Sequence, residues 1–75
     1  MNFYAEKMYL LKIKGAGKLP DYVQIRNEDF MLTAFVNLSG LERGLKKNKL
    51  EKYKDVIEEK LANADFNEVV YIKEG

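Results

Sequence analysis

The chain has 75 residues, of which 47% are hydrophobic, with no cysteine, no histidine and a net charge of +1. Its length predicts a single domain over residues 1–75, and its hydrophobic fraction is that of a folded chain rather than a disordered one. Without cysteine and histidine the chain cannot form disulfides, thiolate metal sites or an imidazole catalyst, so we expect no metal and no cofactor.

The first two predicted strands follow from alternating side chains. Residues 7–14, KMYLLKIK, place their tyrosine, leucine and isoleucine at odd positions on one face. The loop at 15–21, GAGKLPD, contains glycine and proline and cannot continue a strand. In residues 22–26, YVQIR, we expect Val23 and Ile25 to point inward.

A third strand is predicted over residues 30–38, FMLTAFVNL, which are almost wholly apolar. The polar residues 27–29 before it have turn chemistry, so the second and third strands are expected to form a hairpin. A continuous apolar run is typical of a strand that is central in its sheet or covered on both faces.

Two capping boxes predict where helices begin. In such a box a side-chain oxygen accepts a hydrogen bond from the backbone N–H three residues on, and a glutamate returns one. We therefore expect a short helix over residues 39–47 and a main helix over 49–64. The residues that form the boxes are Ser39 with Glu42, and Asn48 with Glu51. The main helix carries one apolar stripe, formed by Leu50, Tyr53, Val56, Ile57 and Leu61.

Residues 66–73, FNEVVYIK, predict a last strand that returns beside the first or the third. The order β-β-β-α-α-β then predicts an α+β fold of two layers. It consists of an antiparallel sheet of about four strands with the main helix packed on one face.

The most charged stretch, RGLKKNKLEKYK at 43–54, holds six basic groups and one acidic group, a net charge of +5. This stretch has two interpretations: the solvent-exposed face of a helix, or a contact surface for an acidic partner or nucleic acid. Lysine is a point charge that reads no base sequence, so any nucleic-acid binding would use phosphates. The candidate binding residues are Arg43, Lys46, Lys47, Lys49, Lys52 and Lys54, joined by Lys14 and Lys18 if the fold brings them near.

Two other features have a structural and a functional interpretation. The loop Lys14–Lys18 places two glycines between lysines, which suits either an anion-holding turn or a flexible connection, but its spacing is not that of a nucleotide-binding P-loop. Several aromatic residues could stack on bases from a sheet surface or could simply pack in the core. These are Tyr4, Tyr9, Tyr22, Tyr71 and Phe35.

The sequence favours binding over chemistry. No motif places a nucleophile or a converging carboxylate pair, so we expect no catalytic residues. If one helix covers the sheet, the strand at 30–38 leaves apolar side chains open, and burying them predicts a homodimer and a protein partner, as in a regulatory module. The expected interface residues are Met31, Phe35, Tyr22 and Tyr71. The alternative is a nucleic-acid-binding module.

No apolar run approaches the ~20 residues of a membrane span, and charged residues interrupt positions 1–14. We therefore expect no signal peptide, no membrane partner and a cytoplasmic protein.

Overall fold

The computed structural model describes residues 6–74. Four strands and two α-helices make up the fold, and short 3-10 turns precede each helix. In chain order they are β1 (Glu6–Ile13), β2 (Tyr22–Arg26), β3 (Leu32–Asn37), η1 (Leu38–Gly40), α1 (Leu41–Lys47), η2 (Glu51–Tyr53), α2 (Lys54–Ala62) and β4 (Val69–Glu74).

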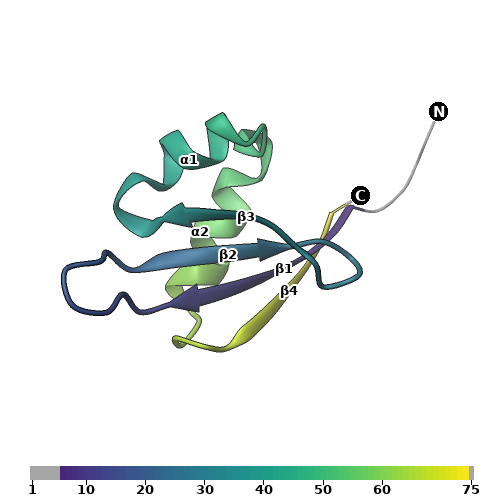
Figure 1. Ribbon diagram of the computed structural model, residues 1–75. Coiled ribbons are helices and arrows are strands. Elements are labelled where there is room, and N and C mark those ends of the chain that lie inside the picture. Colours follow the sequence, from purple (N-terminus) through teal and green to yellow (C-terminus); the bar gives the residue numbers. More distant parts are fainter. Residues whose placement is uncertain (1–5, 75) are drawn as a thin grey trace.

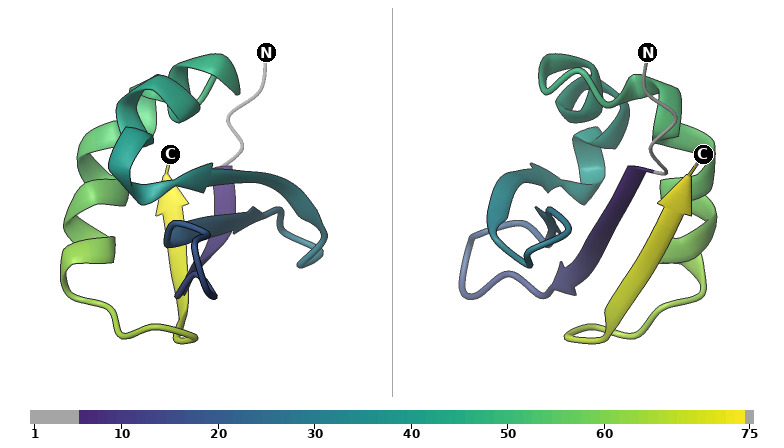
Figure 2. Two further views of the ribbon diagram at one scale, coloured as in Figure 1. Left: turned by 60° about the vertical axis from the view of Figure 1, so that its left-hand side comes forward. Right: turned by 90° about the vertical axis from the view of Figure 1, so that its right-hand side faces the viewer.

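The four strands form one antiparallel sheet in the order β3-β2-β1-β4. Both helices lie on the same side of it, so the molecule has two layers (Figures 1 and 2). The predicted α+β class and element order are confirmed. The last strand returns beside the first, which resolves the choice that the sequence left open, and β2 and β3 form the expected hairpin.

The core forms where the inward side chains of the sheet meet the apolar stripe of the helical segment. Val23 and Ile25 of β2 are fully buried, as their alternation predicted. Ile57 and Leu61 of α2 are buried against the sheet. The apolar stripe therefore packs on one face of the sheet, as its spacing predicted. The opposite face of the sheet carries no helix.

The strand β3 departs from its prediction. The apolar run at 30–38 indicated a central strand or one covered on both faces, yet β3 is an edge strand with one face open. Val36 is buried and Ala34 is half-buried toward the helices, while Phe35 between them is 66% exposed. An apolar run shows that neither face of the strand carries charged side chains. It does not show whether those faces are covered by this chain or by a partner.

The start of α1 also differs from its prediction. Ser39 lies inside η1, and the residue that precedes α1 is Gly40, with no side-chain hydrogen bond to either helix start. Because Ser39 is already part of a 3-10 turn, its hydroxyl is not in the extended position from which a cap reaches forward. The capping box with Glu42 is therefore wrong, although the helix itself is present.

The second capping box is wrong for a related reason. Asn48 ends α1 instead of starting α2, and its side-chain Nδ2 donates to the Gly44 carbonyl at 2.8 Å. Lys49 then takes a left-handed φ of 62°, which breaks the helical path. The predicted division into two helices is confirmed, but the main helix is shorter than 49–64 because it begins only after η2.

Candidate functional site

The register of the sheet lines up apolar side chains on the face that has no helix. Leu11 pairs with Val69 and Tyr9 with Tyr71, whereas the β2 residues opposite Leu11 and Tyr9 are the polar Gln24 and Arg26. We call this surface the open face and define it by Tyr9, Leu11, Tyr22, Phe35, Val69 and Tyr71. In the view of Figure 1, α2 passes behind the sheet and no element lies in front of it.

An aromatic cluster orders one end of the open face. The ring of Tyr9 lies 5.2 Å from that of Tyr71 and 5.2 Å from that of Phe30. The Arg26 guanidinium stands 4.7 Å from the centre of the Phe30 ring and donates to the Phe30 carbonyl at 3.0 Å. Phe30 has a φ of 64°, a left-handed conformation that is strained for a bulky residue. Its ring contacts hold it there.

A hollow of about 380 Å³ marks the other end of the open face. Its floor is the pair of Tyr22 and Phe35, whose ring centres are 6.0 Å apart. Leu19 and Pro20 of the β1–β2 loop form one wall, and Leu32 forms another. Mostly apolar side chains line this hollow, so it suits an apolar group better than an ion.

The four predicted interface residues all reach the surface. Phe35 is 66% exposed, Met31 62% and Tyr71 46%, while Tyr22 is half-buried beneath Phe35. The structure brings Tyr22 and Phe35 together and places Tyr71 beside Tyr9, on the β4 side of the sheet. Met31 lies in the β2–β3 turn.

Five exposed apolar residues lie outside the predicted interface set. They are Leu19, Phe30, Leu32, Phe66 and Val69. The signal for Val69 was present, because alternation placed it on the same face as Tyr71. Leu32 could not be assigned, since a bulge beside Ile25 and Arg26 shifts the register of β3.

The basic stretch is a solvent-exposed surface along α1 and the turn that follows it. Arg43, Lys46, Lys47, Lys49 and Lys52 are exposed, which is compatible both with a solvated helix face and with a binding surface. Lys54 differs from them, because its Nζ lies 3.2 Å from Oε2 of Glu58. The hydrogen bond to Glu58 and the charge of that carboxylate raise the pKa of Lys54 above its ordinary value. Lys54 is thus already engaged within the chain.

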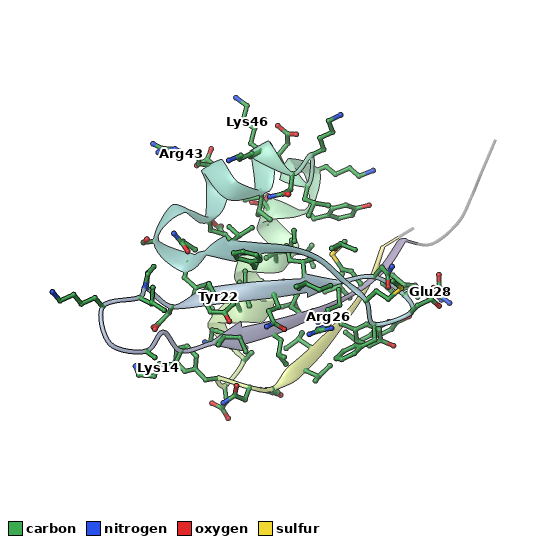
Figure 3. All side chains as sticks on the ribbon, in the orientation of Figure 1. Lys14, Tyr22, Arg26, Glu28, Arg43 and Lys46 are labelled. Carbon is green, nitrogen blue, oxygen red and sulfur yellow. The ribbon has the colours of Figure 1, made fainter. Side chains whose placement is uncertain are left out.

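In the loop at 15–21, one backbone donor is already used within the chain. The N–H of Gly15 donates to the Asp21 carboxylate at 2.8 Å, so this group is not available to an external anion. Lys14 stands over the Phe66 ring, with its Nζ 5.3 Å from the ring centre. Figure 3 shows Lys14 far from Arg43 and Lys46, with β2 and β3 between them in that view. Lys14 therefore does not join the lysines of α1, and Lys18 is exposed in the loop that follows it.

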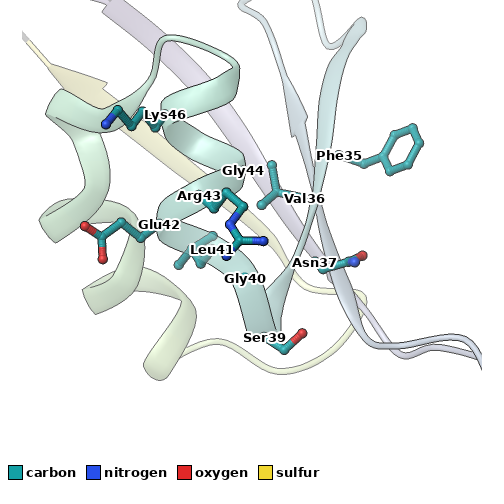
Figure 4. A pocket seen from close by; sticks show the side chains of 10 residues that line it. All are labelled: Phe35, Val36, Asn37, Ser39, Gly40, Leu41, Glu42, Arg43, Gly44 and Lys46. Carbon is teal, nitrogen blue, oxygen red and sulfur yellow. The ribbon is translucent and has the colours of Figure 1, made fainter.

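A second hollow lies between β3 and α1, and we call it the edge groove (Figure 4). The residues that line it include Phe35, Val36 and Asn37 of β3, and Arg43, Gly44 and Lys46 of α1. Gly44 allows the helix to approach, because a Cβ at this position would overlap the Val36 side chain. The glycine thus serves packing and not phosphate binding.

Comparison of the chain with protein-family models, curated proteins and solved structures found no match. Among the described residues, no helix has the length and apolar character needed to cross a membrane, and no group of three or more acidic side chains could hold a metal ion. Tyr4, considered above for base stacking, lies outside the described residues.

Proposed function

We propose that this chain is a small non-catalytic interaction module, which forms a homodimer through the open face and binds a protein partner in a regulatory role. The observation that carries this proposal is the exposure of large apolar side chains on a sheet face that no helix covers. Phe35, Val69 and Tyr71 are 66%, 51% and 46% exposed. Contiguous apolar patches of this kind usually mark an interface. A location in the cytoplasm stays a prediction from composition.

A second copy of the chain is the occupant that best fits the open face. A twofold interface must be complementary to itself, because the same patch lies on both sides. The residues that define the open face are uncharged, and of the basic residues that share this side of the sheet, Arg26 is engaged by Gln24 and Phe30 and Lys7 by Glu28, while Lys73 is exposed near its β4 end. Two copies would therefore meet mainly through apolar side chains. Each half of the interface would bury about 800 Å² in a complex of ordinary size, and the whole chain exposes 5481 Å².

Light scattering at micromolar concentration tests the dimer. We expect twice the chain mass of 8.7 kDa for the wild type and a monomer for Tyr71→Glu, because a buried carboxylate without a partner is costly. Ala62→Glu is the matched control, since it adds the same charge at an exposed position of the helix layer. A monomeric wild type, or a Tyr71→Glu protein that remains a dimer, would contradict the proposal.

The second candidate function is contact with nucleic acid through the basic stretch. It is favoured by the exposure of Arg43, Lys46 and Lys47, none of which has an acidic group at ion-pairing distance among the described side chains. Binding would then act through phosphates, and affinity would fall steeply with salt whatever the sequence bound.

Titration of short DNA and RNA at two salt concentrations tests this candidate. The variant in which Lys46, Lys47, Lys49 and Lys52 are all alanine should flatten the salt dependence by about one unit of slope for each contact that is lost. No binding at low salt would remove the candidate, and strong discrimination between sequences would contradict binding through phosphates alone.

A further inference from the structure

The free edge of β3 lacks the features that usually protect an edge strand. Edges are commonly blunted by charged side chains or proline. The sequence MLTAFVNLSG, residues 31–40, contains neither, whereas the strand at the opposite edge, β4, carries Lys73 and ends at Glu74. The two edges of the same sheet therefore differ, and only β3 is without charge along its whole length.

The hydrogen-bond ladder shows which backbone groups point out from this edge. The N–H of Leu38 donates to the Asp21 carbonyl at 3.0 Å, which continues the β2–β3 register by one pair. Since pairs alternate in an antiparallel ladder, Val36 bonds to β2 while Phe35 and Asn37 turn their N–H and C=O groups away from it. Phe35 therefore presents both its N–H and its C=O to an added strand, and Asn37 presents its N–H, while the Asn37 carbonyl begins the 3-10 turn η1.

The edge groove runs along these outward backbone groups. Phe35 and Val36 both line it, although one side chain is on the open face and the other is in the core. A hollow that touches two such neighbours must lie beside the strand and not over either face. Figure 4 shows it between β3 and α1, with Phe35 on the far side of the strand.

The charge beside the groove indicates the chemistry of its ligand. Two basic residues and one acidic residue of α1 line it, Arg43, Lys46 and Glu42, so the lining is net positive, and neither basic group has an ion-pair partner among the described side chains. Twofold pairing of two β3 edges would place two copies of this basic helix next to each other, which like-charge repulsion disfavours. An acidic ligand is therefore a better match for this groove than a second copy.

We propose that the free edge of β3 binds an extended segment of a partner protein as an added strand, and that Arg43 and Lys46 select acidic side chains on it. Successive side chains of an added strand alternate between the two faces. One set would face α1 and the other would lie beside Phe35, so the preferred ligand alternates acidic and apolar residues. This site adjoins the proposed dimer interface, because Phe35 belongs to both, but it does not require the dimer.

Fluorescent peptides of about eight residues test the ligand chemistry. The probes are a peptide that alternates valine and glutamate, the same residues in two blocks, and a peptide that alternates valine and lysine. We expect the alternating acidic peptide to bind and the other two to bind at least about tenfold more weakly, with affinity falling as salt is added. Binding of all three alike, or of none, would overturn the proposal.

Two sets of variants test the mode of binding. Asn37 has a φ of −64°, which proline accepts, and its N–H points to the free edge. Asn37→Pro should therefore fold and bind about threefold to tenfold more weakly, while Asn37→Ala should bind as the wild type does. Arg43→Glu with Lys46→Glu should weaken binding about tenfold, and Lys73→Glu, on the opposite edge, should not.

Hydrogen exchange of the bound state gives a residue-level readout. The amides of Phe35 and Asn37 should become protected, while those of Ala34 and Val36 are already protected by β2. Equal binding to the wild type and Asn37→Pro, or protection only on β4, would overturn strand addition. Conversion of a wild-type dimer to a monomer by Asn37→Pro would also overturn it, since the edge would then hold a second copy. Binding of the acidic peptide by a monomeric chain would support this inference and contradict the proposed dimer alone.

Discussion

Lys49 occupies a backbone position that usually belongs to glycine. The N–H of Leu50 donates to the Leu45 carbonyl at 2.7 Å and that of Lys49 to the Lys46 carbonyl at 3.1 Å. With the positive φ of Lys49, these bonds form a Schellman motif at the end of α1. The sequence gives no glycine here, and for that reason the turn could not be placed from residue types.

Replacing Lys49 by glycine should stabilise the protein by about 0.5–1 kcal/mol, because glycine adopts this conformation without steric cost. The measurement is urea unfolding at a fixed protein concentration. Lys49→Ala is the control, since it removes the charge and keeps the Cβ, and it should change stability little. A glycine variant less stable than the alanine variant would show that Lys49 is not held in the left-handed region.

Gly44 is the opposite case, because no side chain larger than hydrogen fits at this position. Alanine would favour the helix by about 1 kcal/mol, yet its Cβ would overlap Val36. We expect Gly44→Ala to destabilise the protein by about 1–3 kcal/mol through overpacking. In a Val36→Ala background the same change should cost much less, which a double-mutant cycle measures. A Gly44→Ala protein as stable as the wild type would show that α1 and β3 are less closely packed.

At the scale of elements, Lys12 connects β1 to the end of α2. Its Nζ donates to the Leu61 carbonyl at 2.9 Å in the last turn of the helix, where carbonyls favour a positive charge, and the same carbonyl also accepts from the N–H of Ala64 at 3.3 Å. Lys12 lies on the core side of β1 with the buried Met8 and Leu10, but its partner, 49 residues away in sequence, could not be predicted from the sequence.

Lys12→Met should destabilise the protein by about 1–2 kcal/mol, because it keeps the apolar stem and leaves the carbonyl without its charged donor. Lys14→Met is a close control: both lysines stand over the Phe66 ring, at 5.0 and 5.3 Å from its centre, but no hydrogen bond from Lys14 accompanies this contact. Unfolding curves of the two variants should separate clearly. Equal losses would assign the effect to the ring contact and not to the helix end.

The elements themselves were predicted well where burial imposes a period, and poorly where a helix end depends on backbone detail. Val23 and Ile25 alternate with more polar residues because only one face of β2 is buried, and this alternation can be seen in the sequence. Ser39 and Asn48 match a capping pattern by residue type, but a 3-10 turn and a left-handed lysine change the local backbone, so neither side chain caps a helix start.

At the scale of the whole molecule, the position of each strand in the sheet decides which residues can meet. The exposure of Phe35 and Tyr71 could be predicted from the sequence, because a single apolar helical stripe covers only one of the two faces of the sheet. The edge groove did not, because it depends on β3 being at the edge and on the direction of its ladder. Separation of Lys14 from Arg43 follows from the same strand order.

The charge distribution indicates that the two proposed surfaces act independently. Arg43 and Lys46 lie on the helix layer beside the edge groove, whereas Tyr71 lies on β4 at the opposite edge of the sheet, and the two surfaces have only Phe35 in common. Substitutions at distant positions without shared partners usually act additively. Tyr71→Glu should therefore leave peptide binding unchanged, and Arg43→Glu should leave the dimer unchanged.

The proposed dimer has a consequence for stability that the solution mass alone does not test. A domain of this size has a small core, so burying the open face should supply part of its folding free energy. Folding is then coupled to association, and the midpoint of thermal unfolding, Tm, should rise with protein concentration. A roughly hundredfold increase in protein concentration is worth about 2.7 kcal/mol, which shifts Tm by several degrees in a small domain.

Tyr71→Glu should have a lower Tm that does not change with protein concentration, whereas Ala62→Glu should keep the wild-type dependence. A wild-type Tm that stays constant over this range would mean that the sheet and helices are stable without a second copy, and the open face would then have to serve a different partner.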